Sequence, residues 1–172
     1  MARCGCLGVI WGINGGATVG GAPLSQFGTE TQKQKYLAPL LRGEQRHCLM
    51  ITEPDGTYLS STVLCCSGIV PLLRMLIRYG FNTAGSDVGS LTTTAEMSAD
   101  GKSYTINGQK KWVTQGQWAT HALVGCRTSP TGSKGLSVFI VDLSAEGVTR
   151  KKMENSGVHS SGKLVRNTQI LW

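Results

Sequence analysis

A series of short segments with a two-residue hydrophobic period begins at Leu91 and constrains the fold more than any other feature. The dipeptides Asp100-Gly101 and Asn107-Gly108 punctuate it, and both are of the kind that form two-residue turns with positive φ angles. Alternation between such turns is typical of strands in a small antiparallel barrel or sandwich. The expected strands span residues 91–97, 103–107, 109–115, 119–127 and 136–142, with a sixth at 148–154.

Two further elements are expected before this β-meander. Thr29 followed by Gln32 is a capping-box pattern, and apolar side chains then recur on one helical face as far as Gly43. This pattern predicts a helix over residues 30–42. Residues 46–53 are mostly apolar and carry no turn signal, so they predict a buried strand.

The composition and the distribution of charge limit the kinds of partner that the chain can bind. The chain has 172 residues and 40% hydrophobic residues, which is enough for one packed domain, and its formal net charge is +7. Two stretches, residues 57–83 and 162–172, each add two basic residues and no acid. The rest is close to neutral and has no basic stripe interleaved with aromatic residues, so we expect no nucleic-acid partner.

Motifs that would indicate metal or nucleophilic chemistry are absent from the sequence. The six cysteines form no CxxC pair or zinc spacing, and we interpret them as reduced thiols of an intracellular chain. His47, His121 and His159 are scattered, and no Ser/His/Asp set or phosphate-binding GxxxxGK[ST] motif occurs. We therefore assign no catalytic residue and no metal ligand.

The stretch from Thr57 to Thr83 has a character of its own. It contains adjacent cysteines, no acid, and an apolar run over residues 63–73 that includes Pro71 and ends at Arg74. A membrane helix needs about 20 mostly apolar residues, so this run is too short. Membrane attachment through residues 63–77 is one alternative, but Pro71 and Arg74 speak against it, and no membrane partner is expected.

Six separated segments, taken together and in order, resemble the acyl-CoA dehydrogenase family. They are FGTETQKQKYL (27–37), MITEPD (50–55), AGSDVGSL (84–91), INGQKKWVTQG (106–116), GLSVFIVD (135–142) and SGVHSS (156–161). The resemblance implies an α+β fragment, mainly an antiparallel β-barrel middle domain preceded by a short helical remnant. The expected divisions are a helical remnant at 1–45, a middle domain at 46–161 interrupted by residues 57–83, and a non-family tail at 162–172.

The resemblance also implies FAD as the cofactor. In its terms Trp112 packs against the flavin, Thr114 reaches the N5 side, and the Thr52 hydroxyl makes hydrogen bonds at the ring edge. Gln115 stands where the family usually has Asn. Ser86 matches a serine that touches the acyl-CoA ligand. The full set of implied cofactor-binding residues is Leu49, Met50, Ile51, Thr52, Trp112, Val113 and Thr114.

The implied activity is the α,β-dehydrogenation of an acyl-CoA thioester. The family's catalytic base, a carboxylate, lies in a carboxy-terminal helical bundle that matches nothing in this sequence, so we expect the chain to be an inactive fragment. Electron-transfer flavoprotein or another acceptor would be the partner of the full-length family member, and the family's homo-oligomer is not expected for this fragment. Compartment is left open among mitochondrion, peroxisome and cytoplasm. The alternative function is a non-enzymatic β-domain that binds acyl-CoA or a protein partner.

The family's TEPxAGSD signature is split here between residues 50–55 and 84–87. If Gly56 is encoded GGT and Ala84 is encoded GCN after an ACA codon, the bases from the second position of the Gly56 codon to the first of the Ala84 codon begin with GT and end with AG, as introns do. Gly162 and Lys163 can be encoded to give a second GT start in the same phase. We therefore interpret residues 57–83 and 162–172 as translated intron, with a genuine insertion and tail as the alternative.

Overall fold

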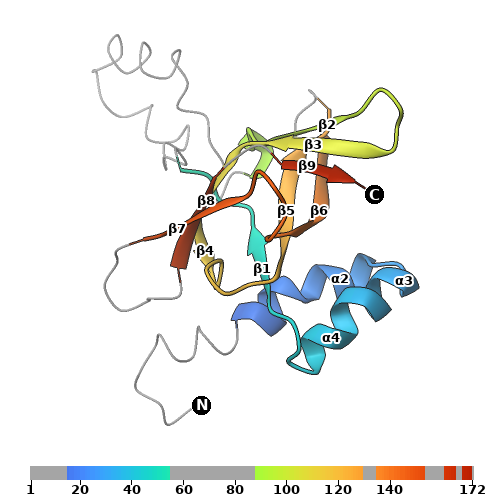
Figure 1. The fold of residues 1–172 in the computed structure, drawn as a ribbon, viewed down its shortest axis with the longest axis vertical. Helices are drawn as coiled ribbons and strands as arrows, with labels where there is room; N and C mark the ends of the chain where they lie inside the picture. Colours follow the sequence, from blue (N-terminus) through green and yellow to red (C-terminus); the bar gives the residue numbers. More distant parts are fainter. Residues whose placement is uncertain (1–14, 55–87, 130–134, 154–160, 166–167, 172) are drawn as a thin grey trace, which may run out of the picture.

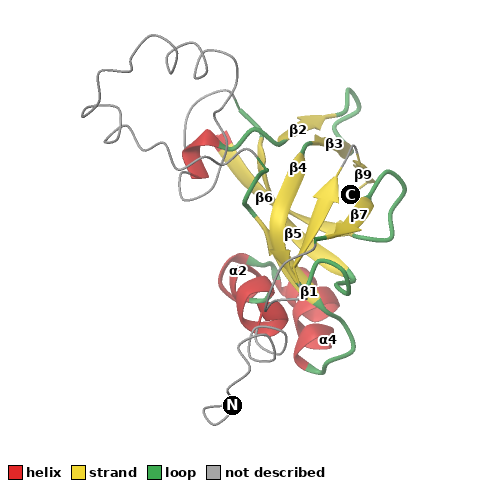
Figure 2. Cartoon of the chain, turned by 90° about the vertical axis from the view of Figure 1, so that its left-hand side faces the viewer, coloured by secondary structure: helices red, strands yellow, loops and turns green. Residues whose placement is uncertain are grey.

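The computed structural model describes residues 15–54, 88–129, 135–153, 161–165 and 168–171. The amino-terminal helices lie at one end of the molecule, next to two β-sheets (Figures 1 and 2). The buried core lies between the sheets and includes Met50, Val113, Val124 and Phe139. The insert proposed from the sequence lies outside the described residues.

Short helical elements follow one another at the amino-terminal end. They are η1 (Gly15–Gly20), α2 (Ala22–Phe27), α3 (Glu30–Gln32), η2 (Lys33–Leu37) and α4 (Ala38–Leu41). The predicted capping box is confirmed, because the Gln32 amide donates to Thr29 Oγ1 at 3.3 Å and the Thr29 amide donates to Gln32 Oε1 at 3.0 Å. The predicted helix over residues 30–42 is therefore correct, although its middle turn is π-helical.

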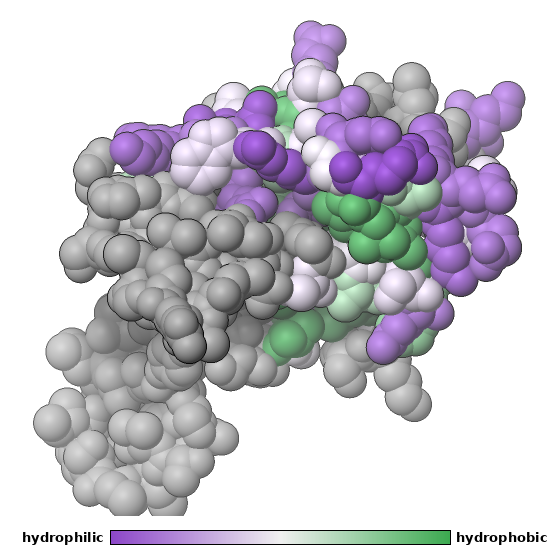
Figure 3. Space-filling model, turned by 90° about the horizontal axis from the view of Figure 1, so that it is seen from below, coloured by the Kyte–Doolittle hydropathy of each residue, from purple (hydrophilic) through white to green (hydrophobic). Residues whose placement is uncertain are grey.

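The helical end contacts the larger sheet through three rings. Tyr36 lies edge-on to His121 with ring centroids 5.2 Å apart, and His121 lies 5.5 Å from His47. His47 is fully buried and its Nδ1 has no hydrogen-bond partner among the described residues. Burial, with a smaller effect from His121, lowers the pKa of His47 to about 4, so the ring is neutral in the fold. The helices also expose Phe27 and Leu41. Seen from below, the molecule carries apolar side chains among mostly polar ones (Figure 3).

The larger sheet is mixed. Its order is β1-β5-β2-β3-β9, and β6 also pairs with β5. The strands are β1 (His47–Met50), β2 (Thr94–Met97), β3 (Ser103–Asn107), β5 (His121–Arg127), β6 (Leu136–Asp142) and β9 (Thr168–Leu171). Three of its pairs are antiparallel, but β1 and β2 each pair parallel to β5, with His47 opposite His121 in the β1–β5 pair.

The smaller sheet has the order β4-β8-β7, formed by β4 (Gln109–Thr114), β8 (Ser161–Val165) and β7 (Thr149–Lys152). The described strands thus form two sheets, one of them mixed, and the expected closed antiparallel barrel is not found among them. Packing the core between two sheets replaces closure of a single sheet.

The predicted hairpin turn at Asn107-Gly108 is wrong. Gly108 joins β3 to β4, and these strands belong to different sheets. A Cβ built on Gly108 would lie 2.4 Å from Thr93 Oγ1, so the glycine is needed for close packing at a crossing point. The Asp100-Gly101 turn is confirmed: Gly101 has a φ of 68° and its amide donates to the Ser98 carbonyl.

Strand positions otherwise follow the pattern closely. The observed β3 and β6 coincide with the predicted ranges 103–107 and 136–142, and the other predicted strands are each shortened at one or both ends. A short 3₁₀ turn, η4 (Val88–Ser90), precedes β2. No strand was predicted after residue 154, yet β8 and β9 lie there and continue the pairing beyond residue 161.

Candidate functional site

An open cleft lies where the end of β1 passes β4. It has a cavity volume of about 170 Å³. The side chains that line it include apolar, aromatic, hydroxyl and cationic groups. They are Val19, Leu49, Ile51, Thr52, Lys111, Trp112 and Thr114. Five of the seven residues that the sequence implied for a cofactor therefore meet at one place, although they come from two segments far apart in the chain.

The other two implied residues point elsewhere. Met50 is fully buried and Val113 is almost so, and both belong to the core cluster. Successive side chains of a strand point to opposite faces, so neighbours of cleft residues must enter the core. Met50 and Val113 can contribute to the cleft through their backbone, while their side chains stabilise the fold.

A bulge in β4 aims Trp112 outward. The pairing of β4 with β8 shifts register between Lys110 and Val113, and Trp112 has a φ of 60°. A positive φ is costly for a bulky residue and persists only where the surroundings fix it. The indole is 53% exposed, and the Lys111 ammonium lies 4.9 Å from its ring centroid. The Trp112 ring is thus a half-exposed aromatic wall of the cleft.

Backbone pairing fixes the width of the cleft. The Lys111 amide donates to the Thr52 carbonyl at 2.8 Å, so the residues after β1 run beside β4. On the inner side, the Lys110 ammonium donates to the Ile51 carbonyl at 2.9 Å. Two adjacent residues of β4 therefore anchor the same short segment.

A buried ion pair behind the cleft was not predicted from the sequence. Lys110 Nζ lies 3.0 Å from Glu53 Oε1, and the side chains are 2% and 1% exposed. The Glu53 carboxylate also accepts hydrogen bonds from the backbone amides and hydroxyls of Thr92 and Thr93. Burial raises the pKa of Glu53, but these hydrogen bonds and the Lys110 charge outweigh it and hold the pKa at about 2. The available signal was a carboxylate at the end of a predicted buried strand, which requires a cation.

The Glu53 carboxylate links residues that stand on either side of a long segment of the sequence. Glu53 precedes the segment 55–87, whose structure is not described, and Thr92 and Thr93 follow it. Ser86, the implied acyl-CoA contact, falls within that segment and lies outside the described residues. Glu53 and Thr92, which stand on either side of that segment, are nevertheless joined by hydrogen bonds.

Other kinds of site find no support in the part of the chain that the structure describes. No group of three or more His, Cys, Asp or Glu side chains could hold a metal ion there. Within the same residues, no helix has the length and apolar character needed to cross a membrane. Cys48 and Cys126 are buried free thiols, and burial raises the pKa of each to about 12, so neither is a nucleophile.

Two family models match the chain. Residues 82–166 match the middle domain of acyl-CoA dehydrogenase, and residues 1–44 match its amino-terminal domain. The chain belongs to the acyl-CoA dehydrogenase family. It is 37% identical over 162 residues to acyl-CoA dehydrogenase AFT10-1 of Alternaria alternata, an alignment that covers 94% of this chain and 31% of the relative.

A second relative is subunit CarC of the caffeyl-CoA reductase-Etf complex from Acetobacterium woodii, which is 32% identical over 139 residues, covering 80% of this chain and 29% of that one. Among solved structures, acyl-CoA dehydrogenase complexed with FAD from Bacillus anthracis superimposes with a TM-score of 0.72 at 25% identity, covering 95% of this chain and 24% of that one. The chain spans about a third of the length of the curated relatives that it matches.

Proposed function

We propose that this acyl-CoA dehydrogenase family chain carries a flavin-contacting cleft and that its cofactor is FAD. The observation that supports this proposal is the meeting of Leu49, Ile51 and Thr52 with Trp112 and Thr114 around one cleft. An isoalloxazine ring is flat and largely apolar, with a polar edge. Such a ring fits a site with an aromatic wall, aliphatic side chains and two threonine hydroxyls.

The size of the cleft limits what it holds. Its volume of about 170 Å³ is below the roughly 300–1,000 Å³ of a pocket that encloses a drug-sized ligand. The cleft therefore suits one side of a ring rather than a whole dinucleotide. In the proposed arrangement the rest of the ligand extends along the protein surface or is covered by other parts of a longer family member.

We further propose that the full-length protein is an oxidoreductase that dehydrogenates acyl-CoA thioesters and passes electrons to electron-transfer flavoprotein or another acceptor. FAD supplies the hydride acceptor for such a reaction. The residues described above would orient its ring, and none of them is placed as the base. General-base catalysis contributes about 10²–10⁴-fold, so these 172 residues by themselves should show no turnover.

A flavin titration of the purified 172-residue chain tests the cofactor. We expect FAD fluorescence to be quenched on binding and the affinity to fall at least tenfold in W112A. The matched control is W118A, because Trp118 is 51% exposed but does not line the cleft. Equal FAD affinity in the two variants would refute the assignment of Trp112.

The same preparation separates the two functions considered from the sequence. Binding of FAD without reduction of a dye by acyl-CoA is the expected result. Binding of an acyl-CoA thioester with no affinity for any flavin would instead favour the non-enzymatic β-domain. Dye reduction by the chain alone would contradict the proposed lack of turnover.

A further inference from the structure

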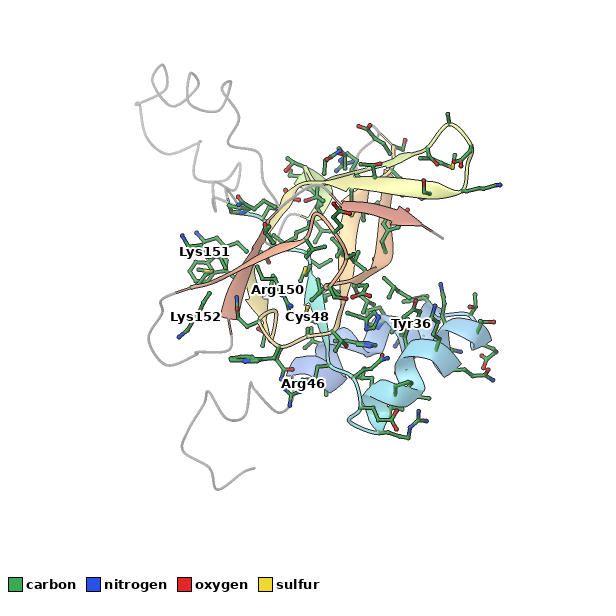
Figure 4. The ribbon with its side chains drawn as sticks, viewed as in Figure 1. Tyr36, Arg46, Cys48, Arg150, Lys151 and Lys152 are labelled. Atoms are coloured by element: carbon green, nitrogen blue, oxygen red, sulfur yellow. The ribbon has the colours of Figure 1, made fainter. Side chains whose placement is uncertain are left out.

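The strand β7 presents a basic surface close to the cleft. All four of its residues, Thr149–Lys152, are exposed, and three of them are cations. Figure 4 shows Lys151 and Lys152 at the outer side of the smaller sheet, whereas Arg150 lies nearer Cys48. Arg150 donates to the carbonyls of Gln117 and Ala119. Within the described part of the chain, no carboxylate lies within ion-pair distance of Lys151 or Lys152.

The sheet register aligns this strand with the bulge that carries Trp112. Leu164 of β8 is opposite both Lys110 and Arg150, and Gly162 is opposite both Val113 and Lys152. Lys151 lies between these two rows, at the level of the residues between Lys110 and Val113. Those residues are Lys111 and Trp112.

Strand alternation places Lys111 and Lys151 on the same face. Lys110 and Arg150 share a row, and their side chains lie on one face of the sheet, where Lys110 pairs with Glu53 and Arg150 donates to the carbonyl of Ala119. The next residue of each strand points to the opposite face. Lys111 lines the cleft accordingly, and β7 is two strands away, about 10 Å at the usual strand spacing.

Lys111 also has no acidic partner in the described residues. Its ammonium lies over Trp112, which leaves its hydrogen-bond donors available to a ligand. Two lysines about 10 Å apart on one face can reach the two phosphates of a diphosphate, each as a charge-assisted donor.

We propose that Lys111 and Lys151 bind the diphosphate of a nucleotide ligand whose ring or acyl portion lies in the cleft. The inference rests on the proposed function, and two ligands share this chemistry: FAD and coenzyme A. Lysines on an edge strand also prevent edge-to-edge pairing between molecules. That role predicts no dependence of ligand affinity on either lysine, so binding measurements distinguish the two.

The experiment compares ligands with and without phosphate on the full chain. Riboflavin, FMN and FAD are titrated by fluorescence, and coenzyme A and pantetheine by calorimetry, with wild type, K111Q and K151Q. Charge-conserving K111R and K151R report whether charge alone suffices. K102Q is the matched control, because Lys102 is exposed in the β2–β3 turn. Circular dichroism verifies that each variant is folded.

If the diphosphate belongs to FAD, wild type binds FAD at least tenfold more tightly than riboflavin. K111Q and K151Q then each lower FAD affinity about three- to tenfold while riboflavin affinity is unchanged. If it belongs to coenzyme A, the same losses occur for coenzyme A relative to pantetheine. K111R and K151R retain most of the affinity in either case.

Riboflavin binding that equals FAD binding, together with coenzyme A affinity unaffected by either lysine, would overturn this inference and leave the proposed function standing. Complete absence of binding by any flavin or coenzyme A would overturn both.

Discussion

Neighbouring residues of β4 have different roles, because some lie on its inner face and others on its outer face. On the inner face, Lys110 and Val113 are buried, and Lys110 is fully engaged with Glu53 and the Ile51 carbonyl. On the outer face, Lys111 and Trp112 line an open cleft. The bulge between Lys110 and Val113 places two consecutive outward residues between two inward ones. The inward residues of β4 therefore stabilise the fold, and its outward residues are available to bind a ligand.

The largest expected difference between the faces is in stability. K110M leaves the buried Glu53 carboxylate without its cation, which costs about 3–5 kcal/mol of unfolding free energy. K111M removes a half-buried cation without a carboxylate partner and should change stability by no more than about 0.5 kcal/mol. Urea unfolding of both variants measures this, and equal losses would show that the faces do not differ.

Acid should weaken the inner face selectively. The folded pKa of Glu53 is about 2 and its ordinary value is 4.5, so the unfolded chain binds the proton first as the pH falls. The stability that this carboxylate contributes is therefore fully present above pH 4.5 and is lost as the pH falls toward 2, up to about 3 kcal/mol.

Urea unfolding at pH 5 and pH 3 measures the loss. E96Q, which alters an exposed carboxylate, is the control and should retain the wild-type dependence. A pH dependence in E53Q as steep as in wild type would show that another group is responsible.

Ligand binding should respond to the outer face. W112A is expected to lower FAD affinity at least tenfold while costing little stability, because half of the ring is already exposed. V113A truncates a core side chain and should cost about 1–2 kcal/mol of stability while FAD affinity stays within about threefold. FAD titration and urea unfolding of both variants measure these effects. A larger loss of FAD affinity in V113A than in W112A would show that the two faces of β4 do not have separate roles.

The smallest effect concerns the chain between Glu53 and Thr92. Because the Glu53 carboxylate holds these ends together, deleting residues 57–83 should leave both faces of β4 unchanged. The deletion shortens the loop less than fourfold. Closing the shorter loop costs less entropy, so the free energy of unfolding should rise by about 1 kcal/mol. A melting curve and a FAD titration of the deletion variant test this, and loss of FAD affinity would mean that the deleted residues support the cleft.

The sequence predicted those elements that depend on local signals. The Thr29 capping box, the Gly101 turn and the strand at 136–142 were all identified from neighbouring residues, because caps, turns and alternation are local properties. The parallel pairing of β1 was not predicted, because nothing in residues 47–50 specifies a partner 74 positions away. The β3–β4 hairpin failed for the same reason: the contact of Gly108 with Thr93 is tertiary.

The candidate site was predicted as a set of segments and not as an arrangement of side chains. Resemblance brought Leu49–Thr52 together with Trp112–Thr114, but only the observed bulge separates Trp112 from Val113. The Glu53–Lys110 pair was missed because a single charge in an apolar run gives no indication of where its partner lies. The strands β8 and β9 were missed because residues 162–172 were set apart as a non-family tail.

The parallel β1–β5 pair also bears on the order of events during folding. A parallel pair cannot close through a tight turn, and here β1 leaves the ribosome long before β5 is synthesised. The antiparallel pairs β2–β3 and β5–β6 join nearby residues and can form early, since short loops close quickly. We expect β1, and the helices attached to it, to dock last. The cleft would then form in the final step, when β1 and the helices, which are synthesised first, pack against the completed sheet.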